Sequence, residues 1–366
     1  MLIAWALVAS CTRIPEPPPT SQSPNQPTPR ASPSEANEPS AAPQGTPAIP
    51  VVDSVEIETV VDNFYDFFQK DKDDKTAKRW LLTNADSFED VRLQAEMGLA
   101  YVITAKVGNK EHVILMDFGL SPSVYENNLK HLHLDISKAE ALVLSHGHQD
   151  HYGGIYLASK TVKAPLYVGG EDVFAHRVLQ TPKKIVDFGT LDRDALAKMT
   201  TKIIIAKQPQ VVAGVALTTG EIPRLTPYEK VPPAMKMEKK GQLVPDPITH
   251  EQALIFNVRG RGLVVITSCA HAGVVNTIEY AKKLTKENRI LAALGGMHLT
   301  MAPDDVIDST VAAVKAIKPK FVSPMHCTGQ RAVAKFQSEM PDAYIHQSVG
   351  TRYVFEAEPA STKPDR

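Results

Sequence analysis

Three histidines and an aspartate fall within six consecutive residues of this chain, in the stretch Ser145-His146-Gly147-His148-Gln149-Asp150-His151-Tyr152-Gly153-Gly154. The preceding residues 141–144 form a short apolar run that is typical of a buried strand. His146 and His148 are two residues apart, so an extended backbone points both side chains the same way. Asp150 and His151 follow in the turn and can face a second point. Imidazole and carboxylate groups are ligands that Zn²⁺ and similar cations prefer, so this loop predicts ligands for two adjacent metal ions.

The same arrangement recurs later in the chain, where three further apolar strands run into a histidine. A single histidine is more often packed or exposed than a ligand, so the repetition matters more than any one residue. The predicted strands 263–267, 290–294 and 321–325 lead to His271, His298 and His326. Because the ends of strands packed side by side lie close together, these histidines and His146 should gather in a pocket at the rim of the sheets.

Composition limits what else the chain can do. Its 366 residues suffice for one large domain or two small ones, and 43% hydrophobic with 22% charged residues is typical of a soluble globular protein. A formal net charge of −1 gives no reason to expect a nucleic-acid partner. The three cysteines, Cys11, Cys269 and Cys327, are too few for a disulfide framework, and a pair between the last two depends on the fold.

The first 50 residues predict a membrane anchor and a tether. Residues 1–11 form a short apolar run that resembles a bacterial lipoprotein signal, in which small residues precede a cysteine that becomes lipidated. No basic residue precedes the apolar stretch, which departs from that pattern; the alternative is an unmodified Cys11. Residues 12–50 are rich in Pro, Ser, Thr and Gln and should be a disordered tether. We therefore expect a protein of the bacterial cell envelope, held on the extracytoplasmic face by a lipid on Cys11.

Residues 51–356 predict one globular α/β domain, followed by a disordered tail at 357–366. Hydrophobic patterns predict helices within 121–138, at 274–286 and from Pro303 onward, and strands at 55–61, 100–107, 112–116, 141–144, 166–168, 202–206, 215–218, 253–258, 263–267, 290–294 and 321–325. Prolines interrupt residues 221–248 repeatedly, so we expect a long loop there that could cover the site.

The histidine motif resembles the signature of the metallo-β-lactamase superfamily. That resemblance implies an αββα sandwich of two packed mixed sheets with outer helices and a metal site at the edge of the sheets. Over nearly all of 55–355 the chain resembles one branch, the 7,8-dihydropterin-6-methyl-4-(β-D-ribofuranosyl)aminobenzene-5′-phosphate synthase-like hydrolases. The matching stretches are 61–63, 95–99, 116–119, 219–224, 268–273, 295–299 and 325–329. Met97 stands where the family has histidine and Phe118 where it has threonine; the first change removes a polar group near the site, so substrate or rate could differ.

The resemblance also implies two divalent metal ions, zinc first and manganese or iron as alternatives. Carried over residue by residue, the first ion would be bound by His146, His148 and His271, and the second by Asp150, His151 and His326. Superfamily sites usually add a bridging carboxylate, which is missing where this chain has Ser268-Cys269. The bridge is then Cys269 as a thiolate, His271 or a solvent hydroxide.

Four further residues could lie near the metal ions, and each has an expected role. His298 is favoured as a catalytic, substrate-contacting residue over a metal ligand. Cys327 is expected to pack behind His326. Asp117, at the end of a neighbouring strand, should orient one of the metal-binding side chains instead of binding the metal itself. Arg224 could hold an anionic substrate, although a solvated charge is the preferred interpretation.

These features predict a metal-dependent hydrolase that uses a metal-bound hydroxide on a small molecule with a phosphoester or cyclic ester. Asp150 would also orient that hydroxide as a catalytic residue. One alternative is a non-catalytic metal- or ligand-binding lipoprotein of the same fold, and another is the synthase-type transferase for which the branch is named. Redox chemistry at a di-iron version of the site ranks last. The complete ligand set favours an enzyme.

The anchor can be tested directly. Cys11→Ser should release the protein from membranes into the soluble fraction, because the acylated sulfur is lost. Cell fractionation and mass spectrometry of the N-terminus measure this, with Cys327→Ser as the matched control that should stay membrane-bound. A soluble wild-type protein with an unmodified N-terminus would show that the lipoprotein interpretation is wrong.

Overall fold

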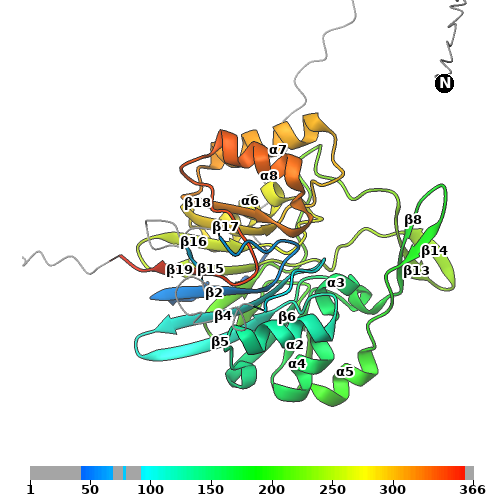
Figure 1. Ribbon diagram of the computed structural model, residues 1–366, viewed down its shortest axis with the longest axis horizontal. Helices are drawn as coiled ribbons and strands as arrows, with labels where there is room; N and C mark the ends of the chain where they lie inside the picture. The colour runs from blue at the N-terminus through cyan, green and yellow to red at the C-terminus, as the bar shows by residue number, and fades with distance from the viewer. Residues whose placement is uncertain (1–42, 69–76, 80–91, 359–366) are drawn as a thin grey trace, which may run out of the picture. The chain divides into compact units, whose positions relative to one another are not determined.

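The computed structural model describes residues 43–68, 77–79 and 92–358. The expected signal at 1–11, residues 12–42 of the expected tether and residues 359–366 of the expected tail lie outside this described part. Two large sheets face one another, and helices cover the outer face of each (Figure 1). This is the αββα sandwich that the sequence predicts. None of the described helices is both long and apolar enough to cross a membrane.

The first large sheet comes mainly from the N-terminal half of the chain. Its strand order is β10-β7-β6-β5-β4-β2-β19-β3. The members are β2 (Ser54–Val61), β3 (Ala77–Arg79), β4 (Ala100–Val107), β5 (Lys110–Met116), β6 (Ala139–Leu144), β7 (Leu166–Val168), β10 (Ile203–Ile205) and β19 (Thr351–Glu356). Its outer face is covered by α2 (Pro122–His131), α4 (Ile155–Thr161) and α5 (Arg193–Met199). Since β5, β6 and β7 run parallel, their carboxyl ends meet at one edge.

The second large sheet has the order β11-β12-β15-β16-β17-β18, and a short β1 pairs with β15. The members are β1 (Val51–Val52), β11 (Val211–Val212), β12 (Ala216–Thr218), β15 (Leu254–Val258), β16 (Gly262–Ile266), β17 (Ile290–Gly296) and β18 (Phe321–Met325). It is covered by α6 (Val274–Thr285), α7 (Asp304–Ile317) and α8 (Gln330–Glu339). The strands β16, β17 and β18 are parallel and buried throughout, as expected where helices cover one face and a sheet the other.

The main core lies between the two sheets. Ile57 and Ile103 from the first sheet belong to the same buried cluster as Phe256 and Ile266 from the second, and none of the four is exposed to solvent. A hydrogen bond of 2.7 Å between Ser323 Oγ and Tyr353 Oη ties β18 to β19 inside this core. The sandwich is therefore held by apolar burial from both sheets.

A third, small sheet corrects the expectation of a long loop at 221–248. Within that segment β13 (Met235–Lys239) and β14 (Gln242–Pro245) form a hairpin, and they join β8 (Arg177–Gln180) and β9 (Ile185–Asp187) beside the sandwich (Figure 1). The prolines bracket the two strands instead of interrupting them, and Pro245 ends an edge strand, where it is tolerated. The partner strand β8 lies more than fifty residues away, so local pattern could not predict this pairing.

Close backbone packing at Gly153 generates a stability prediction. Gly153 caps α3 (Gln149–Tyr152) with a helical φ of −53°, and a Cβ there would lie 1.8 Å from the Leu120 carbonyl oxygen. We expect Gly153→Ala to lower the free energy of unfolding by about 3 kcal/mol, because backbone must move to make room. The control Gly241→Ala has open space around it and a φ of +76°, so it should cost only about 1 kcal/mol. Denaturant titration measures both, and an equal loss would contradict the packing argument.

Candidate metal centre

The histidine loop follows β6 at the rim between the two large sheets. The backbone is extended at His148 but bends at Gly147, so the expected extended segment is interrupted there; Asp150 and His151 lie in the single turn of α3, as the sequence predicts. Gly147 is required between the first two histidines, because a Cβ there would lie 2.3 Å from the carbonyl oxygen of Val173. The histidine loop therefore packs closely against the segment that follows β7.

One group of donor atoms joins His146, His148 and His271. His146 Nε2 lies 3.0 Å from His148 Nδ1 and 3.3 Å from His271 Nε2. All three rings are buried. Burial is the main cause that lowers the pKa of His148 to about 3, and it moves the pKa of the other two in the same direction. Neutral rings keep the lone pairs that a metal ion needs.

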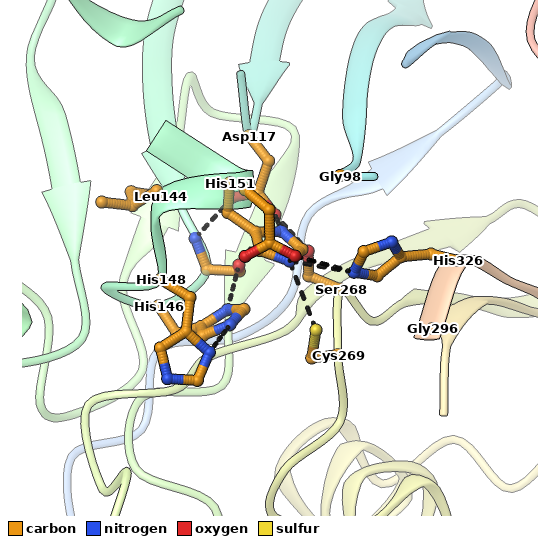
Figure 2. A network of polar contacts seen from close by, with 12 residues as sticks. Gly98, Asp117, Leu144, His146, His148, His151, Ser268, Cys269, Gly296 and His326 are labelled. Carbon is orange, nitrogen blue, oxygen red and sulfur yellow. Dashed lines mark hydrogen bonds and ion pairs between the residues drawn. The ribbon is translucent and has the colours of Figure 1, made fainter. Parts of the chain in front are cut away.

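A second group joins Asp150, His151 and His326. Asp150 Oδ2 lies 3.5 Å from His151 Nε2 and 3.4 Å from His326 Nε2, and the two ring nitrogens are 3.2 Å apart. Figure 2 shows His151 and His326 approaching one another from opposite sides, with His146 and His148 nearby. The family resemblance implies two sets of ligands made of these same six residues. The structure brings the donor atoms of each set together.

The hydrogen bonds behind the second group test whether a cation fits. His151 Nδ1 lies 2.8 Å from Asp117 Oδ2, and His326 Nδ1 lies 2.8 Å from Asn63 Oδ1, so both Nδ1–H groups donate outward. In their neutral forms both rings then direct an Nε2 lone pair inward, toward the carboxylate of Asp150. Three acceptors that converge without a donor repel one another when buried, and a divalent cation resolves this. The residues therefore fit a metal ion.

When no metal ion is bound, a proton on His151 supplies the positive charge in the second group. Burial by itself lowers the pKa of His151, but the nearby carboxylates of Asp150 and Asp117 outweigh burial and raise the pKa to about 10. Metal binding at this group therefore has to displace a proton from His151.

Side chains at other strand ends hold the donors in place. Asp117 follows β5 and accepts hydrogen bonds of 2.8 Å from the backbone N–H and from the hydroxyl of Ser145, as well as from His151. It lies behind His151 in Figure 2, where it would orient that ring. Asp62 accepts the backbone N–H of His326 at 3.1 Å. The chain after β2 therefore supports His326 through both Asp62 and its neighbour Asn63.

Glu251 is a supporting residue that sequence reasoning missed. Its buried carboxylate accepts the backbone N–H groups of His271 and Ala272 at 2.8 and 2.7 Å. Burial raises its pKa to about 7 against the effect of these two bonds. Asp62 and Asn63 directly follow a predicted strand, so their position in the sequence could have indicated a place near the site. Glu251 precedes its strand, and its position gives no such indication.

The two cysteines lie beside the second group. Cys269 Sγ is 3.3 Å from His151 Nε2, and the donor atoms of Cys269, His298 and Cys327 lie within 4.8 Å of one another. Both thiols are free. Cys327 thus faces Cys269 as well as packing near the histidines. Gly296 makes room for this approach, because a Cβ there would lie 2.7 Å from Cys327 Sγ.

Three other residues from the sequence analysis do not join the donor groups, although Phe118 donates its backbone N–H to the His151 carbonyl oxygen at 2.8 Å. Arg224 donates to the Pro247 carbonyl oxygen at 2.7 Å, so it fixes the chain near β14. Met97 is 56% exposed, and the adjacent Gly98 donates its N–H to Asn63. Phe118 is buried and packs edge-on against Tyr125.

Comparisons with known proteins agree with this geometry. The family described as "Metallo-beta-lactamase superfamily" matches residues 93–282, more than half of the chain. A Methanocaldococcus jannaschii protein named 7,8-dihydropterin-6-methyl-4-(beta-D-ribofuranosyl)-aminobenzene-5′-phosphate synthase is 26% identical over 268 residues, covering 70% of this chain and 89% of that relative. An uncharacterized protein of the same organism is 28% identical over 258 residues, covering 69% of this chain and 91% of the relative.

One solved structure is similar in fold. It is described as a metal-dependent hydrolase of the beta-lactamase superfamily, and the two structures agree with a TM-score of 0.65 at 21% sequence identity. The alignment covers 82% of this chain and 99% of that one.

The role of Asp117 can be measured as metal affinity. Asp117→Asn keeps the shape of the side chain but removes the charge that holds His151, so the affinity for Zn²⁺ should fall about 10- to 100-fold. Competition with a chromogenic chelator measures the affinity. Glu140→Gln is the matched control, because Glu140 pairs with the partly exposed His112 at 3.0 Å. Equal affinities in both variants would mean that Asp117 does not orient a ligand.

Proposed function

The chain belongs to the metallo-beta-lactamase superfamily, and from that premise we propose that it is a metal-dependent hydrolase with two metal ions. The observation that supports this most is the second donor group, in which the Nε2 atoms of His151 and His326 converge on Asp150 while their Nδ1 atoms are already hydrogen-bonded to Asp117 and Asn63. Two adjacent donor groups beside a cavity favour an enzyme over a non-catalytic binding protein of the same fold. The proposal is therefore an enzyme.

The two donor groups provide the ligands. His146, His148 and His271 would hold one ion, and Asp150, His151 and His326 the other. Nitrogen and oxygen donors suit zinc, with manganese or iron as alternatives. The donor atoms of His146, His151 and Cys269 also lie within 4.8 Å of one another, so Cys269 would be a further protein ligand between the two groups, in preference to His271. When bound, two such ions supply activated water and stabilise negative charge on a reacting ester.

The chain's own residues supply positioning. Asp150 touches both histidines of the second group, and 13% of its side chain stays exposed, so its free oxygen can accept a hydrogen bond from a water molecule and orient it. His298 lies with its ring centre 4.2 Å from that of His271 and also lines the adjoining cavity, where it would contact the substrate.

We propose a small-molecule phosphoester or cyclic ester as the substrate. Attachment to the cell envelope through Cys11 is a separate proposal that rests on the composition of residues 1–50 alone. A second candidate function is a synthase reaction like the one in the name of the Methanocaldococcus relative. Similarity over 89% of that relative supports it.

Metal analysis with activity assays tests the proposal. We expect about two metal ions per wild-type chain, fewer in His148→Ala, His151→Ala and His326→Ala, and a loss of hydrolysis by orders of magnitude in each, because both ions act together. His298→Ala should keep the full metal content and change turnover or substrate preference. His112→Ala, which alters a histidine paired with Glu140 on the surface, is the matched control.

Two results would contradict these assignments. A wild-type protein that binds no metal with useful affinity would exclude the hydrolase. Loss of a metal in His298→Ala but not in His326→Ala would reverse the roles of these two residues. Product analysis separates the two candidate functions, since a synthase joins two substrates and a hydrolase adds water to one.

A further inference from the structure

A cavity of about 410 Å³ adjoins the metal centre. His271 and His298 line one end of it. The other walls come from the segment that follows β17, from the start of α7 and from the proline-rich segment before β13, and Leu179 of β8 completes them. The small third sheet, the segments that follow β16 and β17, and α7 therefore enclose the cavity together. Its volume lies within the range of small-molecule sites.

The lining of the cavity is mainly apolar. Its walls carry Leu179, Tyr228, Met235, Met297, Leu299 and Met301. Met301 is 87% exposed, which is unusual for so large an apolar side chain, and a ligand in the cavity would cover it. Methionine side chains adapt their shape to a partner, so three of them suit a variable apolar group.

The one carboxylate among the described residues of the cavity wall, that of Glu229, already accepts hydrogen bonds from the protein. Glu229 accepts the N–H groups of Val275 and Asn276 at 2.8 and 3.0 Å at the start of α6, and the hydroxyl of Thr226 at 2.8 Å. It therefore stabilises the helix terminus and is not available to a ligand. Lys230 lies at the exposed margin. Among the described lining residues, no cluster of cations is present that would bind a highly charged molecule.

We propose that this cavity binds an uncharged apolar part of the substrate, an aromatic ring or an alkyl chain, while the ester group lies at the end formed by His271 and His298. This inference rests on the proposed hydrolase and narrows its substrates to esters with an apolar substituent. Burial of such a substituent contributes affinity in proportion to its area, so its removal should weaken binding about 10- to 100-fold.

Direct binding tests the cavity without any catalytic step. N-phenyl-1-naphthylamine, an uncharged apolar fluorophore, should bind to the full chain both with zinc and after metal removal. Met301→Asp and Leu179→Asp should each weaken binding at least about 10-fold, because they place a charge against the apolar ligand. Leu243→Asp is the matched control, since Leu243 is a partly exposed leucine of β14 outside the cavity, and it should bind like wild type. Met301→Asp alters an exposed side chain and should fold normally.

Turnover tests the link between the cavity and the site. We use two pairs of substrates: a naphthyl and a methyl phosphodiester, and a lactone with and without an alkyl chain. The two members of each pair share a reacting group and differ only in the apolar part. Wild type should hydrolyse the apolar member with a lower KM, and Met301→Asp should raise that KM while leaving the KM of the small member unchanged.

The outcomes separate this inference from the proposed function. Probe binding that responds to Met301→Asp but not to Leu243→Asp, without hydrolysis of any ester, supports the cavity and contradicts the hydrolase. Hydrolysis with equal KM for both members of each pair, and no probe binding, supports the hydrolase and overturns the cavity inference. Equal weakening in Met301→Asp and Leu243→Asp also overturns it.

Discussion

Three hydrogen-bond acceptors meet in the interior of this protein, and the rest of the structure depends on that contact. Asp150 Oδ2 and the Nε2 atoms of His151 and His326 lie within 3.5 Å of one another. Outward hydrogen bonds to Asp117 and Asn63 fix both rings so that each lone pair points inward. Such an arrangement is unfavourable in a buried, neutral state and becomes favourable once a positive charge is present. The fold therefore holds these groups close enough to share a positive charge, either a metal ion or the proton that His151 carries in its absence.

Parallel strands bring these groups together. Because β5 and β6 in one sheet and β16, β17 and β18 in the other run parallel, the residues after them emerge at one edge. Asp117, His298 and His326 adopt positive φ values of 58°, 47° and 49° just after their strands. A left-handed conformation costs about 1–2 kcal/mol per non-glycine residue, which the surrounding hydrogen bonds and packing offset. Backbone strain at the ends of the strands thus accompanies the placement of functional side chains.

Local pattern was enough to predict that the histidines gather at the rim of the sheets, because a buried strand that ends at a histidine is a local signal. Ser145 to Gly154 and the strands before His271 and His326 all carry it. The sandwich and the division of the ligands into two groups came from the family resemblance. The small sheet of β8, β9, β13 and β14 could not be predicted, since its pairing joins residues 177–179 to 235–237 and depends on the folded sandwich. Glu251 was missed for a similar reason. It supports His271 through backbone N–H groups twenty residues away, and no spacing in the sequence marks that contact.

The two sides of the metal centre differ in a way that sets the direction of approach. On one side, His148 packs edge-on against Phe188 with ring centres 5.5 Å apart, and His250 accepts the Gly147 N–H at 3.2 Å beside the buried Arg177–Asp246 ion pair. On the other side, His271 and His298 face the apolar cavity. In the proposed hydrolase a substrate would enter from the cavity past His271 and His298, while the contacts of His148 and Gly147 keep the histidine loop fixed. Under the proposed function the cavity wall, which carries Met301 and Leu179, would set substrate choice, because the residues of the histidine loop belong to the donor groups.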